Sequence, residues 1–305
     1  MAKKILLMVC LLASNVAFAE YSRTYMDAQT ASMSDSQGVN IAYKTLGDAD
    51  SEVVVLIMGL GASHSLWGDT FVKGVESAGY RVVLIDNRDT GASTRFDEWG
   101  EPTLWWELLK NQLGFSVTAP YLLNDMAADV VSVMDSLEID RAHIVGASMG
   151  GMIAQIVAAD YPQRTQSLIS IMSTTGAPHL PPPSSDSSSS LMELASNDND
   201  ENSSLATEMK KRGFYPEAVP RQLMAIIKTG DRTERVKTIE APTLVLHGAN
   251  DTLIPPAHGQ HTTDTIAESK LVVFEGMGHD MPEAVMPAIL AEMTAHMALW
   301  PVVGD

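Results

Sequence analysis

Short apolar runs alternate with helix-spaced apolar positions along most of the chain, and turn-forming residues separate them. Residues 52–58 hold an unbroken run of valine, leucine and isoleucine, typical of a parallel strand that is covered on both faces. The expected strands cover residues 39–46, 52–58, 81–85, 142–145, 167–172, 243–246 and 271–274, and the expected helices cover 66–78, 122–137, 152–159, 256–268 and 282–299. This alternation predicts an α/β fold whose central sheet is mainly parallel and flanked by helices.

The alternation is interrupted between residues 176 and 237. Residues 178–204 contain three consecutive prolines, a run of serines and an Asn/Asp tract, which is the composition of a loop. We therefore predict a cap insertion at 176–237 over the strand ends, between core segments at 38–175 and 238–305. An independent second domain is the alternative, but this stretch has little continuous apolar periodicity. Residues 20–37 are expected to be a polar, poorly ordered lead-in.

The N-terminus has the three parts of a cleavable secretory signal peptide. Lys3 and Lys4 precede an apolar run that is too short for a stable membrane anchor, and a small-x-small site ends at Ala19. We predict that residues 1–19 are removed after Ala19 and that the protein reaches the periplasm or the medium. The sole cysteine, Cys10, lies in this leader, so the mature chain has no disulfide and no thiol nucleophile.

The chain of 305 residues is acidic, with a formal net charge of −18. This charge disfavours nucleic acid and anionic membrane surfaces as partners. A small-molecule substrate fits better, and the sequence leaves the oligomeric state open.

The candidate nucleophile is Ser148, in the pattern Gly-x-Ser-x-Gly between an expected strand and an expected helix. The flanking glycines allow a sharp strand-to-helix turn, and the helix start supplies free N–H groups and the positive end of its dipole. A plain tight turn is the alternative interpretation of this motif alone.

A serine nucleophile needs a base and a group that orients the base. Asp251 and His279 each follow a later expected strand, beside glycines, in the order Ser, Asp, His. We predict that His279 is the general base and acid and that Asp251 orients it. The expected oxyanion donors are the backbone N–H groups of Met149 and of Leu60, in the glycine-rich loop after an early strand.

Other polar residues are assigned structural roles. His258 and His261 are three residues apart without an apparent third ligand, so no metal site and no cofactor are predicted. His143 is expected to be packed in its strand, and Asp86 and Arg88 are expected to pair and to organise a loop. The tryptophans and methionines are expected in the core or lining an acyl pocket.

These motifs together resemble the α/β-hydrolase superfamily over nearly all of residues 38–300. The resemblance lies in Met58-Gly59-Leu60-Gly61, in the Asp-Asn-Arg-Asp-x-Gly-x-Ser stretch from Asp86, in the Ser148 motif, and in the loops of Asp251 and His279. Within the superfamily, the chain is similar to the group that includes aclacinomycin methylesterase and bacterial carboxylesterases. That resemblance implies an α/β-hydrolase fold and serine ester hydrolysis under a helical cap without a cofactor; the more usual His-Gly is here Met58-Gly59.

The expected function is therefore that of a secreted serine hydrolase that cleaves small to medium, largely apolar carboxylic esters through an acyl-enzyme. Other chemistry on the same fold is the alternative, namely that of a peptidase, a perhydrolase or a carbon–carbon bond hydrolase. A non-catalytic binding protein is a further alternative, although all three triad positions are filled.

Overall fold

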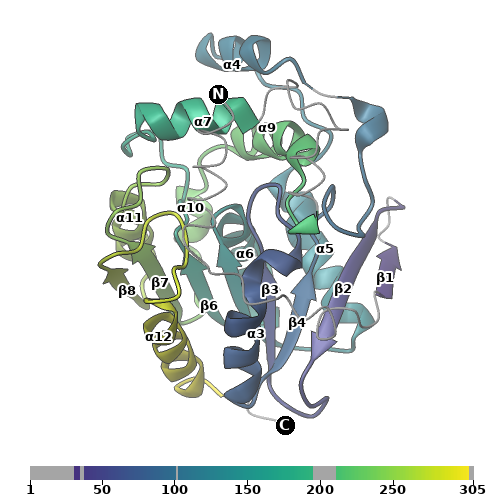
Figure 1. The fold of residues 1–305 in the computed structure, drawn as a ribbon, viewed down its shortest axis with the longest axis vertical. Coiled ribbons are helices and arrows are strands. Elements are labelled where there is room, and N and C mark those ends of the chain that lie inside the picture. The colour runs from purple at the N-terminus through teal and green to yellow at the C-terminus, as the bar shows by residue number, and fades with distance from the viewer. Residues whose placement is uncertain (1–30, 35–37, 101, 195–210, 302–305) are drawn as a thin grey trace.

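An eight-stranded sheet forms the centre of the computed structural model, which describes residues 31–34, 38–100, 102–194 and 211–301 (Figure 1). The strands follow the order β1-β2-β4-β3-β5-β6-β7-β8 across the sheet. They are β1 (Ala31–Ser34), β2 (Asn40–Leu46), β3 (Val53–Ile57), β4 (Arg81–Ile85), β5 (Ala142–Ala147), β6 (Thr165–Ile171), β7 (Thr243–Gly248) and β8 (Ser269–Phe274). β2 pairs antiparallel with both of its neighbours, β1 and β4. The strands β3 to β8 run parallel to one another, so the sheet is mainly parallel, as the alternation predicts.

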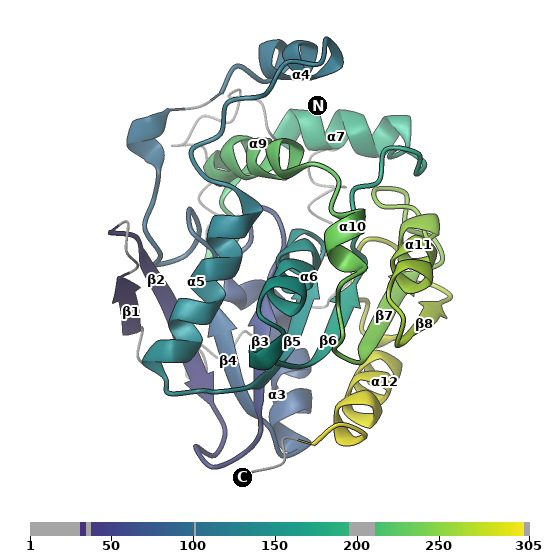
Figure 2. The ribbon, with the colours of Figure 1, turned by 180° about the vertical axis from the view of Figure 1, so that it is seen from behind.

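Helices cover both faces of the sheet, which explains why β3 and β5 are buried at every position (Figure 2). On one face lie α5 (Leu123–Ser136), α6 (Met149–Asp160), α10 (Thr233–Val236) and α11 (Ala257–Thr265), and on the other lie α3 (Gly68–Ser77) and α12 (Met286–Ala298). Short 3-10 turns occupy His64–Trp67, Asp97–Trp99, Pro162–Arg164 and Pro216–Ala218. The two apolar layers between sheet and helices form the core.

The cap at the end of the sheet comes from two parts of the chain (Figure 1). The predicted insertion at 176–237 supplies α7 (Ser185–Leu194) and α9 (Val219–Thr229), and its residues 195–210 lie outside the described residues. A second excursion, between β4 and α5, carries α4 (Leu104–Gln112) and packs Leu104 and Val117 against Phe214 and Val219. The sequence prediction placed the whole cap at 176–237 and missed this excursion, because its short helix has no turn-rich composition to mark it.

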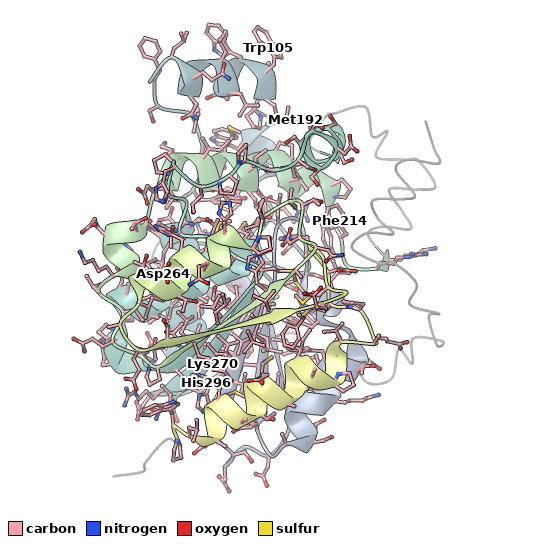
Figure 3. The ribbon with its side chains drawn as sticks, turned by 90° about the vertical axis from the view of Figure 1, so that its left-hand side faces the viewer. Trp105, Met192, Phe214, Asp264, Lys270 and His296 are labelled. Atoms are coloured by element: carbon pink, nitrogen blue, oxygen red, sulfur yellow. The ribbon has the colours of Figure 1, made fainter. Side chains whose placement is uncertain are left out.

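The predicted packing of the tryptophans is wrong for the α4 excursion. Trp99, Trp105 and Trp106 are 40%, 67% and 48% exposed, and Trp105 lies at the outer end of the molecule (Figure 3). The reason is that α4 buries only the side of Leu104 and Glu107, so its remaining faces meet solvent. Trp67, in contrast, is buried and stacks on Phe71 in the core.

The strand β1 lies inside the segment 20–37, where the sequence predicts a poorly ordered lead-in. That prediction is wrong for Ala31–Ser34, which pairs with β2 from Ala31 opposite Tyr43 to Ser34 opposite Asn40. Edge pairing needs only backbone groups, so a short polar stretch can join a sheet without an apolar pattern. The predicted signal peptide at 1–19 and the remainder of 20–37 lie outside the described residues. Among the described residues, no helix combines the length and hydrophobicity needed to cross a bilayer.

Candidate active site

The turn between β5 and α6 holds Ser148 in a strained backbone conformation, with φ 56° and ψ −119°. Two glycines make this turn sterically feasible. A Cβ on Gly146 would overlap the Gly150 carbonyl, and a Cβ on Gly150 would overlap the Ile57 carbonyl of the neighbouring β3. The Gly-x-Ser-x-Gly pattern therefore corresponds to a real packing requirement at both glycines.

Three side chains from separate loops meet at this turn. His279, after β8, places its Nε2 2.9 Å from the Ser148 Oγ, and its Nδ1 lies 2.8 Å from the Asp251 Oδ2. Asp251, after β7, is 3% exposed, and its Oδ1 accepts the backbone N–H groups of Leu253 and Ile254 at 2.9 and 2.8 Å. The structure thus brings together all three residues that the sequence nominates as a triad.

The hydrogen-bond partners set the tautomer of His279. An ionised Asp251 can only accept, so the Nδ1 of His279 carries the proton that faces it, and Nε2 is left to accept the Ser148 hydroxyl. A second histidine, His247, lies 3.6 Å from Asp251. Burial lowers the pKa of His247 more than the nearby carboxylate raises it, and its Nε2–H donates to the Ile254 carbonyl. His247 therefore stays neutral, and His279 is the histidine that bonds both Asp251 and Ser148.

The loop after β3 lies directly against the nucleophile because β3 and β5 are neighbours in the sheet. A Cβ on Gly59 would lie 3.1 Å from the Ser148 Cβ and 3.6 Å from its Oγ. The next residue is Leu60, whose N–H, like that of Met149 at the start of α6, donates to no other described residue. Each predicted oxyanion donor therefore has a backbone N–H that no described residue engages, Met149 directly after Ser148 and Leu60 directly after the residue that approaches it.

Apolar side chains from both parts of the cap gather over this loop. The cluster combines buried residues with partly buried ones, and Leu60 belongs to it together with residues of α4, α7 and α9. Its members are Leu104, Val117, Phe214, Val219 and Met224, with Leu60, Leu66, Ala119, Met192, Leu223 and Ile227 packed against them. The surroundings of Leu60 are thus apolar, and Met192 and Phe214 can be located in Figure 3.

The predicted pairing of Asp86 with Arg88 is wrong. The Asp86 Oδ1 lies 2.6 Å from the His64 Nδ1, and Arg88 forms a buried, bidentate pair with Asp129 at 2.7 and 2.8 Å. Both residues lie in the loop after the end of β4 at Ile85, where the regular side-chain alternation of the strand no longer applies, and each pairs with a residue from another part of the chain. The role itself is structural, as predicted.

A buried ion pair that sequence reasoning missed joins the cap to the core. Arg221 of α9 donates to both oxygens of Asp89 at 2.8 Å, and the Tyr121 hydroxyl donates to Asp89 at 2.6 Å. Burial and the Asp89 charge raise the pKa of Tyr121 well above its usual value, so its hydroxyl stays protonated as a donor. The partners are 132 residues apart, and no local sequence signal links them.

The remaining histidine predictions concern packing and metal binding. His143 is fully buried, as predicted, and burial lowers its pKa to about 4. His258 bonds the Thr174 hydroxyl and the Pro181 carbonyl, and His261 bonds the Thr175 hydroxyl. Within the described ranges, no group of three or more His, Cys, Asp or Glu side chains is arranged to hold a metal ion.

Comparisons with known proteins agree with this architecture. A family model described as the alpha/beta hydrolase fold matches residues 52–202, and one described as TAP-like protein matches 225–297. Rhodomycin D methylesterase DauP of Streptomyces sp. (strain C5) is 28% identical over 293 residues, covering 82% of this chain and 92% of that protein. The putative carbamate hydrolase RutD of Variovorax paradoxus (strain S110) is 26% identical, covering 80% and 91%. A solved hydrolase structure from Pseudomonas aeruginosa PA01 has a TM-score of 0.67 at 21% identity, covering 88% and 98%.

Proposed function

The chain belongs to the α/β-hydrolase superfamily, and from that premise we propose that it is a serine esterase that works through an acyl-enzyme. The observation that carries the proposal is the continuous hydrogen-bonded chain from the Ser148 Oγ through His279 to Asp251. Similarity to a rhodomycin D methylesterase over most of both chains supports ester cleavage in particular.

In the proposed acylation step, the His279 Nε2 takes the hydroxyl proton of Ser148 while the Oγ attacks the ester carbonyl carbon. The carbonyl oxygen becomes an oxyanion that accepts the N–H groups of Leu60 and Met149. The tetrahedral intermediate then collapses, the bond to the alcohol oxygen breaks, and His279 returns the proton to the leaving alcohol. This leaves an acyl group on Ser148.

Deacylation repeats these roles with water as the nucleophile. His279 takes a proton from the water, the hydroxide attacks the acyl carbon, and the Ser148 Oγ leaves and recovers its proton from His279. Asp251 stays ionised throughout and stabilises the imidazolium that forms twice in each cycle. Its burial and its two backbone N–H bonds hold it in place for that role.

The proposed substrates are uncharged esters with apolar groups next to the carbonyl. The cluster around Leu60 supplies apolar surface beside one oxyanion donor. The net charge of −18 also disfavours polyanionic substrates.

Replacement of Ser148 tests the proposed function. We expect Ser148→Ala to lower kcat on a 4-nitrophenyl butyrate ester by at least about a thousandfold, because the nucleophile is lost while the oxyanion donors remain. Labelling of the wild type by a fluorophosphonate probe, and its absence in Ser148→Ala, checks the same residue without a substrate. Full activity of the alanine variant would rule out the mechanism.

Carbamate cleavage is a second candidate, favoured by the similarity to the putative carbamate hydrolase RutD. The same serine chemistry serves both bonds, so the triad does not distinguish them. A screen of esters of graded acyl length beside matched carbamates and amides separates the two: the ester proposal requires the highest kcat/KM on an ester.

The proposed location is the periplasm or the medium, on the basis of the leader at residues 1–19. N-terminal sequencing of the protein from the native host is expected to begin at Glu20. Recovery of the intact chain from the cytosol alone would contradict export.

A further inference from the structure

Gln222 of the cap helix α9 is fully buried and reaches the loop that carries Leu60. Its Oε1 accepts the backbone N–H of Gly61 at 2.7 Å, and its Nε2 donates to the Arg88 carbonyl at 3.0 Å. We propose that Gln222 is a positioning residue that fixes the direction of the Leu60 N–H in the oxyanion site. This inference rests on the proposed function, because it assigns a role within the same site.

Each peptide group around Leu60 is held by a partner. The Met58 carbonyl accepts from the Asn87 Nδ2 at 2.8 Å, and the Gly59 carbonyl accepts from the Ala62 N–H at 3.2 Å. The Gly59 carbonyl and the Leu60 N–H belong to one planar peptide group. The bond from the Ala62 N–H to the Gly59 carbonyl therefore also sets the direction of the Leu60 N–H. Gln222 holds the following peptide at Gly61, so the Leu60 backbone is fixed from both sides.

The cap reaches this loop at further points. The Gly61 carbonyl accepts the Tyr215 N–H at 2.7 Å, and Gly61 has a φ of +68°. A Cβ on Gly61 would lie 2.8 Å from the Val219 Cγ2 and 3.0 Å from the Phe214 ring. Among the described residues of the cap, Gln222 is the side chain that bonds this backbone segment directly, and the Tyr215, Val219 and Phe214 contacts are made by backbone or apolar groups.

Gln222 is itself held rigidly at its other end. The Arg88 carbonyl belongs to a residue whose guanidinium is clamped by Asp129, and the adjacent Arg221 is clamped by Asp89. A donor in an oxyanion site contributes most when it needs no reorganisation during the reaction, and displacements of an ångström cost rate. Gln222 therefore links the backbone next to Leu60 to the rigid junction of cap and core, which limits the movement of the Leu60 N–H.

The test compares two substitutions of Gln222 with a control on the same helix. Gln222→Met keeps the volume and removes both bonds, whereas Gln222→Glu keeps an acceptor for the Gly61 N–H. Thr229→Val removes two bonds at the far end of α9, where the Thr229 Oγ1 accepts the Leu123 N–H at 3.1 Å and donates to the Ala225 carbonyl at 2.7 Å. The readouts are kcat and KM on 4-nitrophenyl butyrate, the rate of fluorophosphonate labelling of Ser148, and the inhibition constant of a boronic acid that forms a tetrahedral adduct on serine.

We expect Gln222→Met to lower kcat and the labelling rate by about tenfold to a hundredfold with KM changed less than about twofold. Boronic acid binding is expected to weaken in parallel, since the adduct places an oxygen in the same site. Gln222→Glu is expected to fall between Gln222→Met and the wild type, and Thr229→Val to stay within about twofold of the wild type in kcat.

An unchanged labelling rate in Gln222→Met, or an equal loss in Thr229→Val, would overturn the positioning role. If Gln222→Met yields no folded protein, the comparison of Gln222→Glu with Thr229→Val replaces it. Equal labelling rates in these two variants would count against the positioning role. The labelling rate needs no ester turnover, so a wild type that labels but does not cleave esters would refute the proposed substrate class and leave the Gln222 comparison intact.

Discussion

At the scale of single residues, the imidazole groups of His279 and His143 differ in burial and therefore in their roles. His279 is partly exposed and bonds both Ser148 and Asp251. His143 is fully buried in β5, its Nδ1 lies 2.8 Å from the Ser167 Oγ, and burial lowers its pKa to about 4. As the pH falls, the unfolded chain binds a proton at His143 before the folded chain does, and this difference lowers the free energy of unfolding.

The stability of the folded state should therefore fall as the pH drops from about 6.5 towards about 4. Between pH 7 and pH 5, His143 alone is expected to remove about 2 kcal/mol from the free energy of unfolding. Denaturant unfolding of the wild type and of His143→Gln at both values measures this, since the variant cannot titrate at that position. Equal losses in the two proteins would contradict the assignment to His143.

At the scale of elements, the packing of β3 against the β5–α6 turn explains the glycines of the nucleophile motif. A Cβ on Gly150 would run into the Ile57 carbonyl, a backbone atom that cannot rotate away. Gly278, beside His279, offers a contrast, because a Cβ there would meet its nearest atom at 3.4 Å. One glycine is required by packing, and the other is not.

We expect Gly150→Ala to lower the free energy of unfolding by at least about 3 kcal/mol, as overpacking against backbone does. Gly278→Ala should cost less than about 1 kcal/mol, since its new methyl group meets ordinary van der Waals contacts. Thermal unfolding of the two purified variants makes the comparison. A Gly150→Ala protein as stable as the Gly278→Ala protein would show that the turn can relax.

The sequence pattern predicts this part of the structure well, for a physical reason. Buried parallel strands and amphipathic helices carry their environment in local spacing, so every strand from β2 to β8 was predicted near its observed place. Ser148, Asp251 and His279 follow such strands, and their meeting is a consequence of parallel order. The strand β1 and the helices α4 and α7 were missed, and the loop expected at 178–204 is wrong for Ser185–Leu194. Backbone pairing and a mostly exposed short helix leave little local pattern, and the serine run within α7 is typical of a loop.

At the scale of the whole molecule, ion pairs of contrasting burial join the cap to the core. The Arg221–Asp89 pair is almost completely buried, whereas Arg95 and Glu217 are 24% and 13% exposed at a separation of 2.8 Å. Neither pair is visible in the sequence, because each joins residues more than a hundred positions apart. Long-range polar pairing, and with it the role proposed for Gln222, became apparent only in three dimensions.

Removal of one partner from the buried pair should be costly. Arg221→Met leaves the Asp89 carboxylate in the interior with the Tyr121 hydroxyl and the Phe96 backbone N–H as its remaining partners among the described residues, so we expect a loss of about 3–5 kcal/mol in unfolding free energy. Arg95→Met, the matched change in the more exposed pair, should cost about 1 kcal/mol or less. Chemical denaturation compares the two, and similar losses would mean that burial does not decide the strength of this junction.

The positions of the three triad loops along the chain determine when the site is completed during synthesis. Ser148 is made near the middle of translation, but Asp251 and His279 come from the loops after β7 and β8, the last two strands. Under the proposed mechanism, a nascent chain that stops before β8 would hold a strained serine with no base beside it. Hydrolytic competence is therefore acquired late, when the final edge of the sheet has docked.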